Sequence, residues 1–328
     1  MINEINIRTY ENKDKDQVLD LLNRNFQIQE HMKLNRDSEW WEWKYERSIF
    51  GKPIIYVAEH NDKIIGVRPF WPWQLSNGGQ VLTCYQPIDS VVDKEYRGLG
   101  LFTMLTKNAL VENKEKMDLV FNFPNEQSIR GNLKLGWTFV NKLNWYVKIN
   151  KFYTFYKLIK NYSGFESCSL QAEDLISEDK IKKIDYSFDA GNIFRTIKSE
   201  EFLKWRFLEH PKIRYGLNII NRNGKEFIYI FALNKNNYGR ELIILDYFGD
   251  LEIFEHFIKE VDYISRKYHA TYTLIIKKYN LSNTLFFKHF YIPQNKKNFV
   301  VLPINQEYEY LSKQYENWEI CLGMHDSV

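Results

Sequence analysis

The stretch that decides the fold reads Val91-Val92-Asp93-Lys94-Glu95-Tyr96-Arg97-Gly98-Leu99-Gly100-Leu101-Phe102. A predicted strand ends at Val92, two glycines follow, and the spacing of apolar residues from Leu101 to Val111 predicts a helix. Glycine lets the backbone take a positive φ and approach a ligand closely. Backbone amides at the start of a helix point toward one spot, where the helix dipole also favours negative charge. The turn therefore suits a diphosphate, although two glycines alone also fit an ordinary turn.

The predicted elements on either side of this turn alternate between strands and helices. Upstream and downstream of it, the first half is predicted to contain strands at 5–7, 54–59, 63–71, 81–92 and 118–123, and helices at 14–26, 101–111 and 127–135. Asn61-Asp62 is a turn signal that joins two of these strands in a hairpin. This alternation predicts an α/β (α+β) layer architecture.

The second half repeats part of this order at an offset of 162 residues. Ser38–Tyr45 lines up with Glu200–Phe207, and the turn Asn61-Asp62-Lys63 lines up with Asn223-Gly224-Lys225. Two features at one offset favour a duplicated unit. We therefore expect a first domain at 1–150, a connector at 151–180 and a second domain at 181–328.

The composition narrows the classes of function. Hydrophobic residues make up 44% of 328 residues, which is enough for two domains with sizeable cores. The formal net charge of +3, from 45 basic and 42 acidic residues, argues against general nucleic-acid binding. Cys84, Cys168 and Cys321 stand apart and no HExxH motif occurs, so no metal site is expected. A charged N-terminus and the lack of a long apolar run predict a cytoplasmic protein without membrane contact.

The turn resembles the acetyl-CoA signature of the GNAT (Gcn5-related N-acetyltransferase) superfamily, Q/R-x-x-G-x-G/A. Arg97 and Gly100 correspond to the arginine and the first glycine, whereas Phe102 stands in the last small position. Downstream, the spacing of the second family motif, N-x-x-A-x-x-x-Y-x-x-x-G-F, is matched by Asn125, Ser128, Gly136 and Trp137.

This resemblance implies two GNAT-like domains, each a mixed, mostly antiparallel sheet flanked by helices. The second domain would be a degenerate copy, because Asp246-Tyr247-Phe248-Gly249-Asp250 replaces the signature turn.

The resemblance also implies a binding site for acetyl-CoA as co-substrate, without a metal. The backbone of the strand before the turn would pair with the pantetheine arm, and an amide there would meet the thioester carbonyl. The residues expected to bind the co-substrate are Val91, Val92, Arg97, Gly98, Leu99, Gly100, Leu101, Phe102, Asn125 and Ser128.

The sequence identifies the catalytic residues less directly than the residues that bind the co-substrate. Asp89 is the favoured general base because it lies on the strand that leads to the turn, while Glu59 and Glu126 are the other candidates. Asn132 stands where many GNAT enzymes carry a general-acid tyrosine. An amide cannot donate that proton, so another group donates it, or none is needed, or activity is lost.

Three further features have both a binding and a structural interpretation. The segment Trp40–Tyr45 could stack on a sugar or a base, but its spacing favours packing in the core. Arg68 could hold a phosphate or carboxylate of the acceptor, or form a surface ion pair. His31 could contribute to the acceptor pocket or have a structural role.

The first functional hypothesis is an N-acyltransferase that moves acetyl from acetyl-CoA to a small-molecule amine. The sequence also looks like GNAT proteins of bacterial surface-polysaccharide synthesis, which suggests an amino-sugar acceptor. One alternative is a Fem-type aminoacyltransferase, which the intact turn and the modest net charge disfavour. Another is a CoA-binding scaffold without turnover. A homodimer is possible under each hypothesis.

Overall fold

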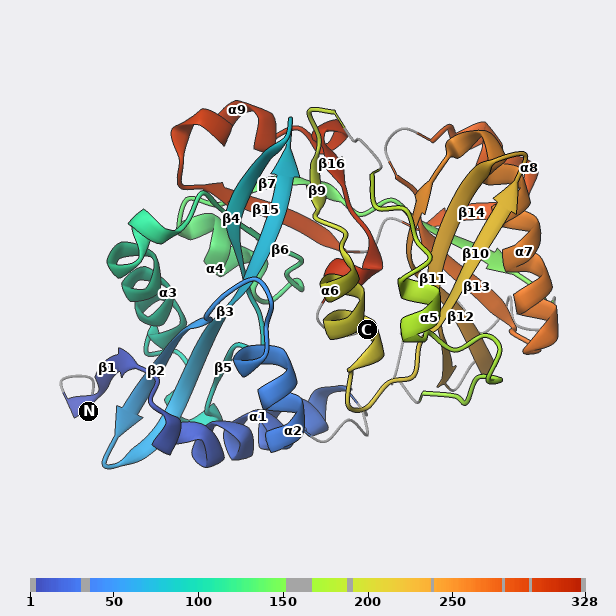
Figure 1. Cartoon of the computed structure of the whole chain (residues 1–328). Coiled ribbons are helices and arrows are strands. Elements are labelled where there is room, and N and C mark those ends of the chain that lie inside the picture. The colour runs from blue at the N-terminus through green and yellow to red at the C-terminus, as the bar shows by residue number, and fades with distance from the viewer. Residues whose placement is uncertain are drawn as a thin grey trace.

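The computed structural model describes residues 4–30, 36–151, 167–187, 191–236, 239–278, 281–294 and 297–325. Two twisted sheets lie side by side and helices cover them (Figure 1). None of the helices in these ranges is both long and apolar enough to cross a membrane. His31 and residues 152–166, half of the predicted connector, lie outside the described residues.

The first sheet has the main strand order β1-β2-β3-β4-β6-β15-β7. All neighbours on this path pair antiparallel except β4 and β6, which are parallel. Three short strands, β5, β9 and β16, pair beside it. The bounds are β1 (Asn6–Thr9), β2 (Ile54–His60), β3 (Lys63–Asn77), β4 (Gln80–Pro87), β5 (Val91–Val92), β6 (Leu119–Asn122), β7 (Thr138–Lys142), β9 (Phe194–Thr196), β15 (Asn298–Pro303) and β16 (Trp318–Glu319).

The second sheet has the order β10-β11-β12-β13-β8-β14, and only β12 and β13 are parallel. Its strands are β8 (Trp145–Ile149), β10 (Gly216–Arg222), β11 (Lys225–Asn236), β12 (Gly239–Gly249), β13 (Tyr272–Ile276) and β14 (Tyr291–Gln294). The expected mixed, mostly antiparallel sheets are thus confirmed.

Each sheet contains at least one strand from the other half of the chain. β8, from the first half, lies between β13 and β14 of the second sheet. β15, from the second half, lies between β6 and β7 of the first sheet, where its red ribbon crosses among green and blue strands in Figure 1. The two halves therefore cannot be separated by one cut without breaking a sheet, and the domain boundaries expected from the sequence stay predictions.

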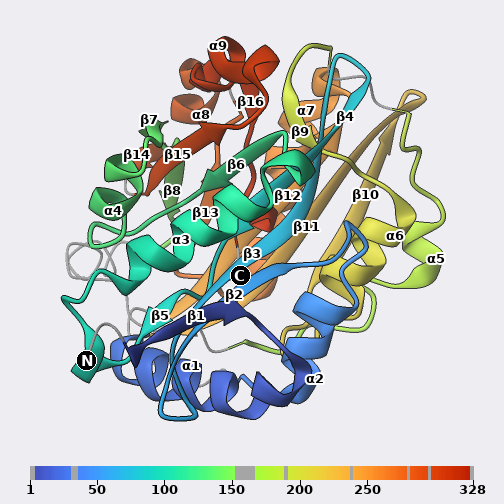
Figure 2. The same ribbon diagram turned by 90° about the vertical axis from the view of Figure 1, so that its left-hand side faces the viewer.

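The helices pack against both sheets. In the first half they are α1 (Lys15–Glu30), α2 (Ser38–Trp41), α3 (Leu101–Glu112) and α4 (Ile129–Lys134). In the second half they are α5 (Glu178–Ile181), α6 (Glu200–Leu203), α7 (Phe254–Lys267), α8 (Asn283–Lys288) and α9 (Glu309–Ser312). Apolar residues of α1 and of α3 belong to different buried clusters, because the two helices cover opposite faces of the first sheet (Figure 2).

The repeat at an offset of 162 residues recurs in three dimensions. α2 runs into a short π-helix at Glu42–Glu46, and α6 runs into another at Lys204–Leu208. Trp43 Nε1 donates to the carbonyl of Trp205 at 2.6 Å, and Trp205 Nε1 donates to the carbonyl of Trp43 at 2.9 Å. Two tryptophans 162 positions apart in the chain thus form a reciprocal pair of hydrogen bonds.

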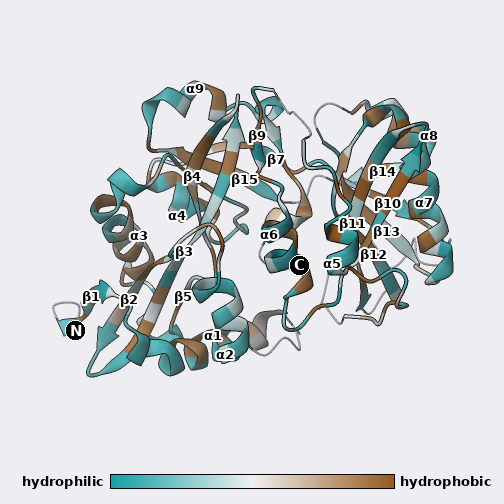
Figure 3. Cartoon of the chain, viewed as in Figure 1, coloured by the Kyte–Doolittle hydropathy of each residue, from teal (hydrophilic) through white to brown (hydrophobic). Residues whose placement is uncertain are grey.

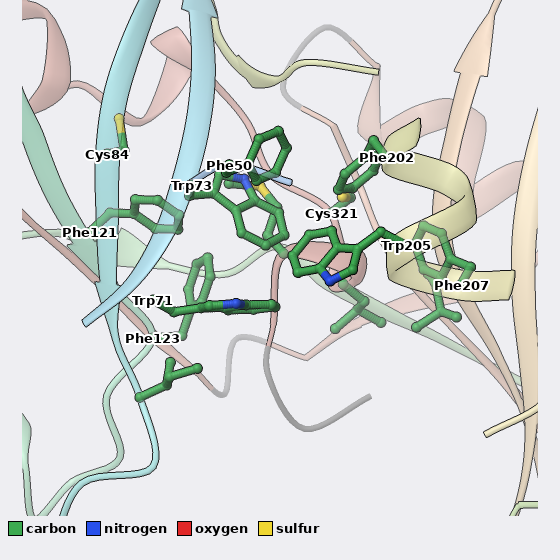
Figure 4. Close-up of a cluster of buried hydrophobic side chains, with 14 of the residues drawn as sticks. Phe50, Trp71, Trp73, Cys84, Phe121, Phe123, Phe202, Trp205, Phe207 and Cys321 are labelled. Carbon is green, nitrogen blue, oxygen red and sulfur yellow. The ribbon is translucent and has the colours of Figure 1, made fainter. Parts of the chain in front are cut away.

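One aromatic core joins the two halves. Trp71 and Trp73 of β3 lie 5.5 and 6.2 Å from Trp205 between ring centroids, and all three side chains are buried (Figure 4). The central strands of both sheets are largely apolar, whereas polar residues dominate the outer faces of the helices (Figure 3). The aromatic residues of Trp40–Tyr45 are buried as well, so the packing interpretation of this segment is confirmed.

Candidate functional site

The candidate site lies where β4 and β6, the two parallel neighbours of the first sheet, separate from each other. β4 and β6 pair only at Cys84–Leu119 and Tyr85–Val120. Beyond this point the chain bends at Asp89, which has a φ of 44°, and β5 pairs with β3 alone. In the described part of the chain no strand pairs with the other edge of β5. This edge is therefore open to an extended ligand.

The glycine turn follows directly and starts α3. Gly98 and Gly100 have φ values of 84° and 75°, in the left-handed region that glycine tolerates best. No side chain caps α3, and no described residue accepts a hydrogen bond from the amides of residues 98–102. Helices α2, α6 and α8, by contrast, each begin with a side-chain cap. The start of α3 thus presents free amides and the positive end of the helix dipole, which suits a diphosphate.

The space in front of this turn is open. A Cβ placed on Gly98 or on Gly100 would meet no atom within 4 Å. Arg97 is exposed beside them, with Nε donating to the carbonyl of Val92 at 3.2 Å and Nη2 donating to Asn25 Oδ1 at 3.1 Å. Its guanidinium therefore ties the end of β5 to α1, and only its remaining N–H groups are available to a phosphate.

Asn125 and Ser128 form the start of α4. Asn125 Oδ1 accepts from the amides of Gln127 and Ser128 at 3.1 and 2.9 Å, and from Ser128 Oγ at 2.9 Å. These bonds give both residues a role in shaping the loop before α4. Their contact with pantetheine stays a prediction.

Phe102 departs from the small residue of the family signature, and the structure gives the physical reason why this is tolerated. A Cβ on Gly131 of α4 would lie 2.9 Å from the Phe102 ring. The ring therefore occupies space that Gly131 leaves open between α3 and α4. The guanidinium carbon of Arg68 lies 4.2 Å from the centroid of the same ring.

Arg68 is buried on the face of the sheet that α3 and α4 cover. It is 2% exposed and donates to Thr106 Oγ1 at 3.1 Å, Ser90 Oγ at 2.6 Å and Asn132 Oδ1 at 3.5 Å. Among the described residues no carboxylate pairs with it, so the surface ion pair considered for Arg68 is wrong. Burial lowers the pKa of the Arg68 guanidinium to about 9, which leaves it charged at neutral pH.

Asn132 is fully buried beside Arg68. Its Oδ1 faces the guanidinium, and its Nδ2 has no hydrogen-bond partner in the described part of the chain. The residue that replaces the family's tyrosine is thus an amide with an unused donor.

The three candidate bases all have partners. Asp89 Oδ2 accepts from Lys44 Nζ at 2.6 Å and from the Tyr45 hydroxyl at 2.8 Å. Glu59 accepts from Arg8 at 2.7 Å, and Glu126 accepts from Asn298 at 3.1 Å. The base assignment of Asp89 stays a prediction.

Residues near the C-terminal end of the described chain also reach this region, and the sequence analysis missed them. The His325 ring stacks on Phe123, just after β6, with a centroid distance of 5.7 Å. Its Nε2 lies 2.8 Å from Lys297 Nζ, and its carbonyl accepts from Arg206 at 2.9 Å. Burial and these cations hold the pKa of His325 well below its ordinary value, so the ring is neutral. No local motif around residue 325 signals this position.

The described part of the second half has no equivalent glycine turn before a helix. β12 leads into a 3₁₀ turn at Leu251–Ile253, and Asp250 Oδ1 accepts from the amide of Glu252 at 2.9 Å. Asp93 caps the 3₁₀ turn after β5 in the same way, so the two halves differ after this turn: α7 begins directly at Phe254, without a glycine-bearing segment such as 97–100.

Comparison with known proteins decides the family of the first half. Residues 6–140 match the family described as acetyltransferase (GNAT) domain. These residues form a GNAT domain. The open edge of β5 and the uncapped start of α3 both lie inside it. No curated protein matches the sequence.

Solved structures extend the likeness in fold beyond the GNAT domain. A GCN5-related N-acetyltransferase from Anabaena variabilis is 13% identical, with a TM-score of 0.61 over 92% of this chain and 73% of that one. A probable N-acyltransferase from Enterococcus faecalis is 10% identical, with a TM-score of 0.62 over 93% and 74%. N-myristoyltransferase from Saccharomyces cerevisiae, solved with myristoyl-CoA, is 13% identical, with a TM-score of 0.56 over 92% and 83%. At these identities the likeness shows a shared two-sheet fold.

Proposed function

We propose that the protein transfers an acyl group, acetyl in the first instance, from acyl-CoA to a primary amine. The observation that carries this proposal is the uncapped start of α3, with the free amides of residues 98–102, beside the open edge of β5. Bound acyl-CoA would supply an activated thioester.

The chain's own residues would bind and orient this co-substrate. The amides of residues 98–102 would hold the diphosphate, and the N–H groups of Arg97 that remain free would add charge-assisted hydrogen bonds. Backbone groups of Val91 and Val92 on the open edge of β5 would pair with the pantetheine arm. This arrangement would direct the thioester into the opening between β5 and β6.

The amine must lose a proton to react. Asp89 Oδ2 already accepts from Lys44 Nζ and from the Tyr45 hydroxyl, so this oxygen is engaged in holding these two side chains. We therefore propose that Asp89 mainly positions Lys44 and Tyr45, and that the amine reacts from its neutral form. If Asp89 is instead the base, Asp89→Asn will lower turnover without lowering the affinity for CoA.

The proposed acceptor is an amino sugar, which rests on the likeness to GNAT proteins of surface-polysaccharide synthesis. The test is CoA release from acetyl-CoA in the presence of a panel of amino sugars, polyamines and peptides with a free amino terminus. Release with one class of amine supports the proposal and names the class. Calorimetric binding of acetyl-CoA without release for any amine would favour the CoA-binding scaffold.

We also propose that the second half is a GNAT copy that has lost its diphosphate site. The second sheet repeats the order of the first, with β10-β11-β12-β13 in place of β2-β3-β4-β6 and β8-β14 in place of β15-β7. The reciprocal pair of Trp43 and Trp205 supports the same relation. In this half α7 begins at Phe254 directly after the 3₁₀ turn, so the copy would lack the glycine-bearing segment proposed to bind the diphosphate.

A further inference from the structure

We propose that Arg68 and Asn132 form a charge-stabilising site for the sulfur of CoA, so that the thiolate leaves without receiving a proton from a side chain. This inference rests on the proposed function, and it deepens that function by assigning a leaving-group site.

The first observation is the position of Arg68. Its three hydrogen bonds reach Ser90 in the bend before β5, Thr106 on α3 and Asn132 on α4. The open edge of β5 and the start of α3 are parts of the proposed CoA site. The guanidinium therefore lies at the point where the elements around the proposed pantetheine path meet.

The second observation is that this cation lacks a counterion in the described part of the chain. Arg68 is 2% exposed, and its partners are two hydroxyl groups and an amide. Burial of an unpaired charge is unfavourable. On the opposite face of the sheet, buried Lys44 is paired with Asp89 at 2.6 Å. An anion beside Arg68 would remove this imbalance.

The third observation is independent of the charge. The Nδ2 group of Asn132 is buried without an acceptor among the described residues, although Asn132 Oδ1 faces Arg68. A buried donor without a partner is costly, so it too calls for an acceptor at this place. One group with negative charge would satisfy both Arg68 and Asn132.

The sulfur of CoA fits these requirements better than a fixed carboxylate, because it becomes an anion only during the reaction. As the bond from the amine nitrogen to the acyl carbon forms, the carbon–sulfur bond breaks and its electron pair stays on sulfur. Arg68 and the Nδ2–H of Asn132 stabilise that thiolate, and the proton of the amine passes to solvent. The released thiolate takes up a proton from water if the pH lies below its pKa.

The test is the pKa of the CoA thiol when CoA is bound to the full-length protein. The thiolate absorbs in the ultraviolet, and CoA without its sulfur atom serves as the blank. A cation a few ångströms away should lower the thiol pKa by about 1–2 units from its value in free CoA. The shift should disappear in Arg68→Gln and persist in part in Arg68→Lys.

Arg130→Gln is the matched control. Arg130 is exposed on the same helix as Asn132, two residues away, so its loss removes the same charge without changing the buried site. The thiol pKa should not change in this variant.

Three outcomes separate the inference from the proposed function. A bound thiol that titrates in the wild-type protein as free CoA does overturns the leaving-group site, and no variant is needed to show it. The leaving-group site is also overturned if Arg68→Gln still binds the sulfur-free CoA but shows the same thiol pKa as the wild type. Failure of both CoA and its sulfur-free form to bind the wild type instead refutes the proposed function.

Discussion

Gly100→Val separates the conformational role of this glycine from its role in binding. Gly100 has a φ of 75°, so valine costs about 1–2 kcal/mol of stability through backbone strain. A Cβ at this position would meet no atom within 4 Å, so no packing clash adds to this cost. The side chain would instead occupy the place proposed for the diphosphate.

The expected loss of CoA affinity follows from the bonds that the side chain would displace. Two hydrogen bonds to a charged group, at roughly 1.5 kcal/mol each, correspond to about 100-fold in Kd. Titration calorimetry with CoA measures this loss, and urea unfolding measures the cost in stability.

Gly79→Val provides the matched control. Gly79 lies in the hairpin between β3 and β4, has a φ of 82° and also has open space around a Cβ. This variant should lose the same stability as Gly100→Val and keep the wild-type affinity for CoA. Wild-type affinity in a folded Gly100→Val protein would refute the diphosphate assignment.

Three further predictions concern buried polar contacts. Asp89→Asn leaves Lys44 buried without its charge partner and should lower the free energy of unfolding, measured in urea, by about 3 kcal/mol. Adding Lys44→Met should restore part of the lost stability. A single variant as stable as the wild type would contradict the ion-pair role. Burial and neighbouring cations hold the pKa of His210 well below its ordinary value, and its Nδ1 accepts from two backbone amides. Below pH ~6.5 the unfolded chain therefore binds a proton at residue 210 that the folded chain does not, so the free energy of unfolding should fall by up to about 1.4 kcal/mol per pH unit. Urea unfolding at pH ~7 and ~5 measures this slope, and His210→Asn should reduce it. An unchanged slope in this variant would disprove the role of His210. Trp205→Phe removes the donor to the Trp43 carbonyl and should cost about 1–3 kcal/mol by thermal unfolding, whereas a neutral effect would show that the reciprocal pair contributes little.

Local sequence patterns predicted the elements that surround the site. The hairpin turn at Asn61-Asp62, with φ values of 49° and 58°, and the glycine turn before α3 both lie where their residue types indicated. The repeat at an offset of 162 residues was also visible, because the same caps, helices and turns require similar residues in both halves.

The exchange of strands between the halves could not be predicted in this way. β8 and β15 are ordinary apolar segments, and their partners lie more than a hundred residues away in the chain. Pairing at such separation depends on the packing of the whole molecule, which a local pattern does not contain. The position of His325 against Phe123 could not be predicted for the same reason.

The role of Arg68 was hidden by its position in a long strand. β3 is buried over most of its length on both faces, so alternation of polar and apolar residues is absent there. A single arginine in such a strand can point to either face, and the sequence left a surface ion pair open. Only the contacts with Thr106, Ser90 and Asn132 place it on the proposed CoA side.

The most direct measurement is a crystal structure of the protein grown with CoA. We expect the diphosphate oxygens to lie within hydrogen-bond distance of the amides of residues 98–102, with pantetheine along β5. A diphosphate bound elsewhere, for example at the start of α7, with the amides of residues 98–102 facing only solvent, would contradict the account.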